Sequence, residues 1–143
     1  MSTPLQPLAC TARLEALRRE YTAQIIAIAA RNRRTVRVVP YVVAQTGSER
    51  RADLELIEQY ATQMRWKTTR TTFADLRQPL PLDQRPGFAA ACRYAAQGYA
   101  HGILAITRPA ITTDNDSYAH VVEHLRERRV FLAYLPALRE PTP

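Results

Sequence analysis

Apolar side chains recur at helical spacing near the start of the chain. Over residues 9–33 they lie three or four positions apart, which places them on one face of a helix. This predicted buried face consists of Leu14, Leu17, Tyr21, Ile25 and Ile28. The opposite face is predicted to carry Arg13, Arg18, Arg19, Glu20 and Gln24. A basic cluster at the end of the helix suits the negative pole of the helix dipole.

Short apolar runs then alternate with further helical segments. Strands are predicted at residues 36–43, 66–73, 102–107 and 130–135, which are rich in β-branched or other apolar side chains. Helices are predicted in the three intervals between them. This alternation implies right-handed crossovers and parallel strands. We therefore predict an α/β fold, a three-layer sandwich whose mainly parallel four-stranded sheet has helices on both faces, plus an extra N-terminal helix.

The predicted boundaries are a helical extension at residues 1–34, an α/β domain at 35–136 and a tail at 137–143. Pro40 interrupts the first predicted strand. Because proline has no N–H to donate to a neighbouring strand, we expect a bulge or a sheet edge there. Ser48 is expected to cap the next helix, and Thr46 to bond its own backbone in a turn.

The composition favours an intracellular protein without bound metal or cofactor. Cys10 and Cys92 are far apart and show no metal-binding or redox spacing. His120 and His124 have an i, i+4 spacing that can bind a metal, but a solvated helix face explains them better. The apolar run at 25–30 is too short to span a bilayer, and the N-terminus lacks the apolar centre of a signal peptide. We expect a cytoplasmic protein that does not contact membranes.

The chain is strongly basic, with a formal net charge of +7. All but one of its 20 basic residues are arginine, the exception being Lys67. Arginine forks suit phosphate groups, which favours a nucleic-acid partner. The same bias also arises in genomes rich in G and C, so composition alone does not assign the partner.

The region from residue 37 to 136 resembles the N-terminal catalytic domain of serine recombinases, the resolvase and invertase family. The similar segments are residues 41–46, 56–61, 64–66, 73–75, 85–88 and 102–106, followed by the last helix and strand. The most specific of them is Arg85-Pro86-Gly87-Phe88, which opens a helix after a loop that contains aspartate.

The resemblance implies an attack by serine on a DNA phosphodiester, assisted by arginines. It places the family's arginine at Val43 and its serine at Gln45, so both are absent here. Arg108 falls nearer the family's aspartate position, and the rest of the arginine motif that follows the third strand is missing. Asp75 and Arg85 do match family positions. We therefore expect the catalytic chemistry to have been lost.

Three hypotheses follow. The first is a non-catalytic, DNA-associated regulatory or interaction protein derived from mobile DNA, which binds nucleic acid or a related recombinase. Its candidate DNA-binding residues are Arg31, Arg33, Arg34, Arg50, Arg51, Arg85 and Arg108. The second is a divergent recombinase or nuclease that uses Thr46 or Ser48 as its nucleophile. The third is a protein-binding module. The N-terminal helix is expected either to cover its own domain or to contact a second copy or a recombinase.

Overall fold

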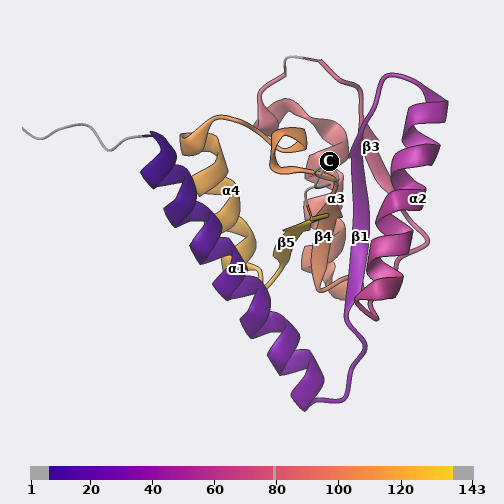
Figure 1. Cartoon of the computed structure of the whole chain (residues 1–143), viewed down its shortest axis with the longest axis vertical. Coiled ribbons are helices and arrows are strands. Elements are labelled where there is room, and N and C mark those ends of the chain that lie inside the picture. The colour runs from indigo at the N-terminus through magenta and orange to yellow at the C-terminus, as the bar shows by residue number, and fades with distance from the viewer. Residues whose placement is uncertain (1–6, 79, 137–143) are drawn as a thin grey trace, which may run out of the picture.

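The computed structural model describes residues 7–78 and 80–136, in which helices and parallel strands alternate (Figure 1). The helices are α1 (Pro7–Arg31), α2 (Gly47–Gln63), α3 (Pro86–Tyr94) and α4 (Asn115–Glu127). The strands are β1 (Arg37–Val43), β2 (Lys67–Thr68), β3 (Phe73–Asp75), β4 (Gly102–Ala105) and β5 (Phe131–Tyr134). Short helical turns are η1 (Leu82–Gln84), η2 (Ala95–Tyr99) and η3 (Arg108–Ala110). The predicted tail at 137–143 lies outside the described residues.

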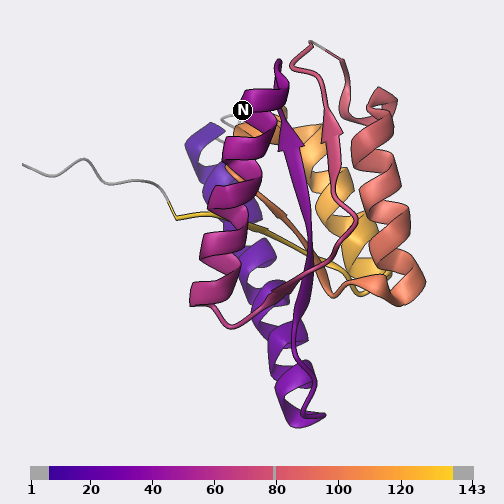
Figure 2. The ribbon, with the colours of Figure 1, turned by 90° about the vertical axis from the view of Figure 1, so that its right-hand side faces the viewer.

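The sheet order is β2-β1-β4-β5, and β3 also pairs with β1. All pairings are parallel. Figure 2 shows α2 on one side of the sheet and α3 and α4 on the other. One core cluster packs Ile57 of α2 and Ile25 of α1 against the sheet, and another packs Phe88 of α3 and Leu125 of α4. The predicted α/β architecture is confirmed.

Pro40 lies in the middle of the central strand, where it pairs with Leu104 of β4. On the other side of β1, neither β2 nor β3 pairs with Pro40, so the strand has a local edge there, which is one of the two predicted alternatives. The predicted strand 66–73 is split, because β2 pairs with the start of β1 and β3 with its end. The carbonyl of Val38 accepts from Thr69 and the N–H of Ala44 donates to Asp75, so even-numbered residues of β1 face this side. The absent N–H of Pro40 faces the gap between β2 and β3.

The face that α1 buries is rotated from the predicted one. Leu17 and Ile28 are 50% and 48% exposed, whereas Arg18, predicted on the solvent face, is only 9% exposed. The reason is that α1 lies beside β5, the border strand of the sheet. Arg18 Nη1 donates to the carbonyl of Leu132 in β5 at 2.7 Å. A buried donor is favourable there because an edge strand leaves backbone groups without a partner strand.

Arg18 also belongs to a partly buried polar network. Its guanidinium forms an ion pair with Glu15 at 2.8 Å and lies 4.7 Å from the centre of the Tyr134 ring. The Tyr118 hydroxyl donates to Glu15 at 2.6 Å. Helix α1 therefore packs on its own domain, which is one of the two arrangements expected for it. Contact of this helix with a second copy or a recombinase stays a prediction.

Three helices end in the same unusual way. The residues that follow α1, α2 and α4 in the left-handed conformation are Arg33, Arg65 and Arg129, with φ of 55°, 62° and 60°. In each case the next residue donates its N–H five positions back, to Ala29, Ala61 and Leu125 respectively. This is the Schellman motif, in which glycine is the usual left-handed residue. A side chain in that conformation costs roughly 1 kcal/mol. Among the described residues, the glycine with a positive φ is Gly98, at 97°, in the turn η2 that follows α3.

Candidate functional site

Gln45 lies at the carboxyl end of β1, the region where many α/β proteins place reactive groups. Its side chain is exposed, and its Nε2 donates to the carbonyl of Arg77 at 2.9 Å. Its backbone N–H donates to the Glu49 carboxylate at 3.0 Å. An amide in this position holds the loop after β3 in place but cannot form a phosphoester bond.

The hydroxyl groups near Gln45 have structural roles that differ from the predicted ones. Thr46, not Ser48, caps α2, because Thr46 Oγ1 accepts from the N–H of Glu49 at 3.1 Å. The Glu49 carboxylate reaches back toward the start of the helix, as in a capping box. Ser48 lies exposed in the first turn. Among the described residues, neither hydroxyl bonds to a histidine or carboxylate that would act as its base.

Asp75, at the end of β3, occupies the N-terminus of α3. Its two carboxylate oxygens accept from the N–H groups of Gly87 and Phe88, each at 2.8 Å. Gly87 permits this approach, since a Cβ there would overlap the carbonyl of Ala74. A helix N-terminus of this kind is where proteins hold phosphate. Here the protein's own carboxylate fills the position.

The Tyr41 hydroxyl donates to the same carboxylate at 2.7 Å. Burial raises the pKa of Tyr41, as do the hydrogen bond to Asp75 and the charge of Asp75, while Arg85 acts in the opposite direction. The phenol therefore stays protonated and serves as a hydrogen-bond donor. Tyr41 is not available as a nucleophile at neutral pH.

Two of the candidate arginines, Arg85 and Arg108, are bound to protein groups. Arg85 Nη1 donates to the carbonyls of Ala110 and Ile111 at 2.8 and 2.6 Å. Arg108 Nη2 donates to Asn115 Oδ1 at 2.6 Å, and its guanidinium lies 4.1 Å from the centre of the Tyr118 ring. The buried Nε of Arg108 has no hydrogen-bond partner. Both side chains fix the connection between β4 and α4.

The remaining candidate arginines are exposed but do not gather at one place. Arg50 and Arg51 lie in the first turns of α2, beyond the carboxyl end of β1. Arg31, Arg33 and Arg34 precede β1 and lie at the opposite end of the sheet. The structure therefore divides the predicted DNA-binding residues into two exposed groups and a half-buried pair, Arg85 and Arg108, that is bound to protein groups.

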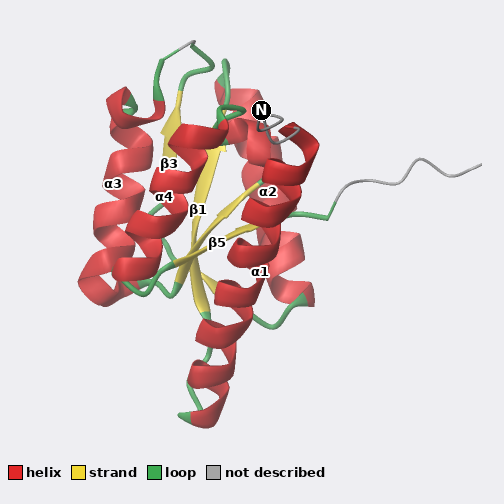
Figure 3. Cartoon of the chain, turned by 90° about the vertical axis from the view of Figure 1, so that its left-hand side faces the viewer, coloured by secondary structure: helices red, strands yellow, loops and turns green. Residues whose placement is uncertain are grey.

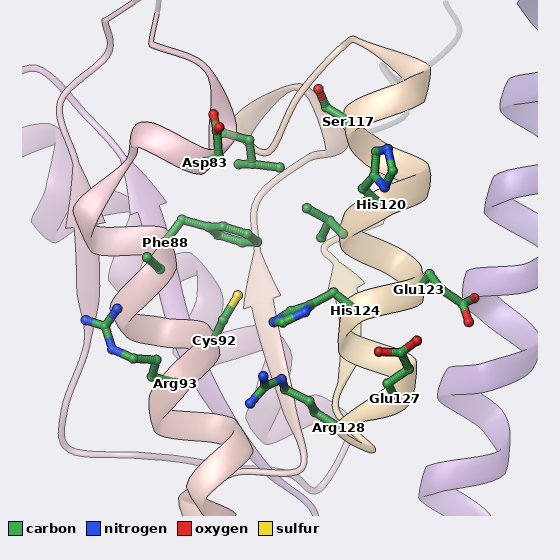
Figure 4. Close-up of a pocket in the computed structure, with 13 residues that line it drawn as sticks. Asp83, Phe88, Cys92, Arg93, Ser117, His120, Glu123, His124, Glu127 and Arg128 are labelled. Atoms are coloured by element: carbon green, nitrogen blue, oxygen red, sulfur yellow. The ribbon is translucent and has the colours of Figure 1, made fainter.

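A groove of about 930 Å³ lies between α3 and α4. Figure 4 shows its walls, with Phe88 and Cys92 on α3 and His120 and His124 on α4. Sequence reasoning assigned the two histidines to a solvated helix face and missed the groove, because it forms only when the two helices pack. Among the described residues, no cluster of three or more His, Cys, Asp and Glu side chains is arranged to hold a metal.

Cys92 in this groove is expected to be a poor nucleophile. Burial raises the pKa of its thiol to about 12 from an ordinary 9.0, although Arg128 and Arg93 act in the opposite direction. At about pH 8 its thiolate fraction should be about 1,000-fold below that of an ordinary cysteine. Alkylation by iodoacetamide, followed by peptide mass spectrometry, should therefore be slow in the native protein and fast in guanidinium chloride. Equal rates in the two states would show that the thiol is not shielded.

Among the described residues, none of the helices combines the length and apolar character required to cross a bilayer. Comparisons of the chain with protein-family models, curated proteins and solved structures found no match.

Proposed function

We propose that this protein is a non-catalytic relative of the serine recombinases that associates with nucleic acid. The non-catalytic part rests on the contacts at the carboxyl edge of the sheet, which is the end where β1 and β3 finish. The groups a phosphoryl-transfer site would use there are bound to the protein itself. Gln45 holds the loop at Arg77, Asp75 closes the N-terminus of α3, and Arg85 is bound to backbone carbonyls.

The geometry of this edge opposes catalysis. Stabilising a phosphoryl-transfer transition state requires hydrogen-bond donors aimed at the reacting phosphate. Each Arg85 donor bonded to a carbonyl would first have to break that bond, and the released carbonyl would lose a partner. A phosphate approaching α3 would meet the negative charge of Asp75. Both features oppose a bound phosphodiester at this edge.

The nucleic-acid part of the proposal is supported by charge. The chain carries a net +7, and its exposed arginines supply forked donors for phosphate. Binding driven by phosphate neutralisation weakens steeply as salt is added, because counterions are released on association. A salt-dependent affinity for DNA would therefore separate this function from that of a protein-binding module.

The catalytic part can be tested on supercoiled plasmid. Gln45 cannot form a phosphoester, and within the described part of the chain no base is bonded to Thr46 or Ser48. The purified protein should therefore give no nicking and no covalent protein–DNA adduct after denaturing electrophoresis. Gln45→Ser should also be inactive, since Arg85 and Arg108 stay bound to the protein. An active recombinase of the same family serves as the positive control.

Two variants test the alternative nucleophiles. Thr46→Asn removes the Thr46 hydroxyl but keeps a side chain that caps helices well. Ser48→Ala removes the Ser48 hydroxyl. An adduct formed by the unaltered protein and lost in either variant would establish the divergent recombinase or nuclease. Absence of both adduct and DNA binding would favour the protein-binding module.

A further inference from the structure

The parallel topology brings distant basic segments to one end of the molecule. Each of α1, α2 and α4 leads into a strand, namely β1, β2 and β5. Because these strands run parallel, the three turns that precede them lie at the same end of the sheet. We name this end the amino edge and define it as residues 31–37, 64–67 and 126–130. The register agrees, since Arg37 pairs with Lys67, and Val38 and Phe131 both pair with Gly102. Figures 1 and 3 show the last turns of α1 projecting beyond the other elements at this end.

The amino edge carries the whole net charge of the chain. It holds nine basic residues and one acidic residue, Glu127, which leaves 11 basic and 12 acidic residues elsewhere. The basic side chains are all exposed: Arg31, Arg33, Arg34, Arg37, Arg65, Lys67, Arg126, Arg128 and Arg129. Genome composition would enrich arginine along the whole chain and does not explain its concentration at one end.

Few carboxylates at this end pair with the basic side chains. Among the described residues, Arg126 alone of the nine forms an ion pair, at 3.7 Å from Glu123, and both side chains are mostly exposed. The pKa of nearby His101 is lowered by burial and then by the charges of Arg34 and Arg37. Eight of the nine groups are arginines with forked donors that suit the oxygens of a phosphate.

The left-handed arginines point to selection for charge at this edge. Arg33, Arg65 and Arg129 each occupy a position that glycine would fill without strain, as Gly98 does after α3. Unfavourable backbone conformations are kept mainly where the side chain has a use. The three strained residues all lie at the amino edge, one before each of β1, β2 and β5.

We infer that the amino edge, rather than the carboxyl edge, binds the phosphate backbone of double-stranded nucleic acid. This inference rests on the proposed function and assigns its surface. The arginines before β2, β1 and β5 are distributed over three strand spacings, about 14 Å. That width is close to the major groove of a duplex, about 12 Å. The edge therefore reaches phosphates on both sides of one groove.

The test is a salt titration of binding to a short fluorescent DNA duplex of mixed sequence, followed by anisotropy. The variant R33G/R65G/R129G removes three charges and relieves the left-handed strain. Its affinity at moderate salt should fall at least tenfold, and the slope of log K against log salt should fall by about 2 to 3. Its thermal midpoint should equal or exceed that of the unaltered protein, which excludes unfolding as the cause.

The matched control, R50Q/R51Q/R70Q, removes three exposed arginines outside the amino edge and should retain the affinity and the salt slope. Loss of binding in this control, with binding kept in the amino-edge variant, would overturn the inference and leave the proposed function standing. No binding by the unaltered protein would defeat both. Binding to vesicles of anionic lipid that is stronger than binding to the duplex would overturn the inference in favour of a membrane surface.

Discussion

Replacement of Arg18 by alanine is expected to lower the free energy of unfolding by about 3 kcal/mol. The substitution leaves the Glu15 carboxylate without its ion pair and the carbonyl of Leu132 without its charged donor. It also removes the cation that lies over the Tyr134 ring. Urea denaturation followed by circular dichroism would measure the loss, which is a large share of the stability of a small domain.

A double-mutant cycle with Glu15→Gln separates the ion pair from packing. Arg18→Met keeps much of the side-chain volume and serves as the packing control. Burial acts to raise the pKa of Glu15, but hydrogen bonds from Arg18 and Tyr118 and the charges of Arg18 and Arg108 outweigh it, so the pKa is lowered from 4.5. The stabilisation is therefore present above about pH 4.5 and is lost as the pH falls below it. Unchanged acid stability in Glu15→Gln would contradict this account.

Replacement of Asp75 by alanine should cost about 3 kcal/mol and also create an anion site. The N–H groups of Gly87 and Phe88 and the Tyr41 hydroxyl would lose their shared acceptor. The freed helix N-terminus would then accept an external anion. Sulfate should therefore raise the melting temperature of Asp75→Ala more than that of the unaltered protein, when both are compared with chloride at equal ionic strength.

Tyr41→Phe is the control for Asp75→Ala. It removes one of the three groups that donate to Asp75 and keeps the carboxylate. It should cost about 1 kcal/mol and show no added response to sulfate. If Asp75→Ala unfolds at nearly the same urea concentration as the unaltered protein, Asp75 does not hold α3 in place. If it is destabilised but insensitive to sulfate, the helix N-terminus is closed by something other than the carboxylate.

The layer architecture was predictable because short apolar runs alternate along the chain with segments of helical periodicity. The split between β2 and β3 was not, because residues 66–73 form one continuous β-prone run. The cause of the split lies outside that run, in Pro40 of the neighbouring strand. Because proline has no N–H to donate, it affects the strand that lies beside it. The sequence does not show which strand lies beside Pro40.

The buried face of α1 was misassigned for a similar reason. Apolar spacing selects the face with Leu17 and Ile28, which are in fact about half exposed. The partner surface is partly polar, because α1 covers the border of the sheet, where the Leu132 carbonyl requires a donor. A hydrophobic pattern locates a helix but does not reveal a polar surface on the element it packs against.

At the candidate site, sequence reasoning placed Gln45 after the first strand but chose Ser48 over Thr46 as the cap, two positions too late. It matched Arg85 to a family position without access to its carbonyl partners. The amino edge was visible only as separate basic clusters, because its segments are up to about 100 residues apart. The left-handed arginines give no sequence signal, since the usual signal for that conformation is glycine.

The coverage of β5 by α1 and the break between β2 and β3 together decide how copies of the protein can crowd together. One border of the sheet is blocked by a helix, and the other offers strands of only two and three residues. Neither border provides a template long enough for a strand from a neighbouring molecule. Copies of the protein bound side by side on one nucleic acid would therefore contact one another through helices and turns, and not by adding strands to each other's sheets.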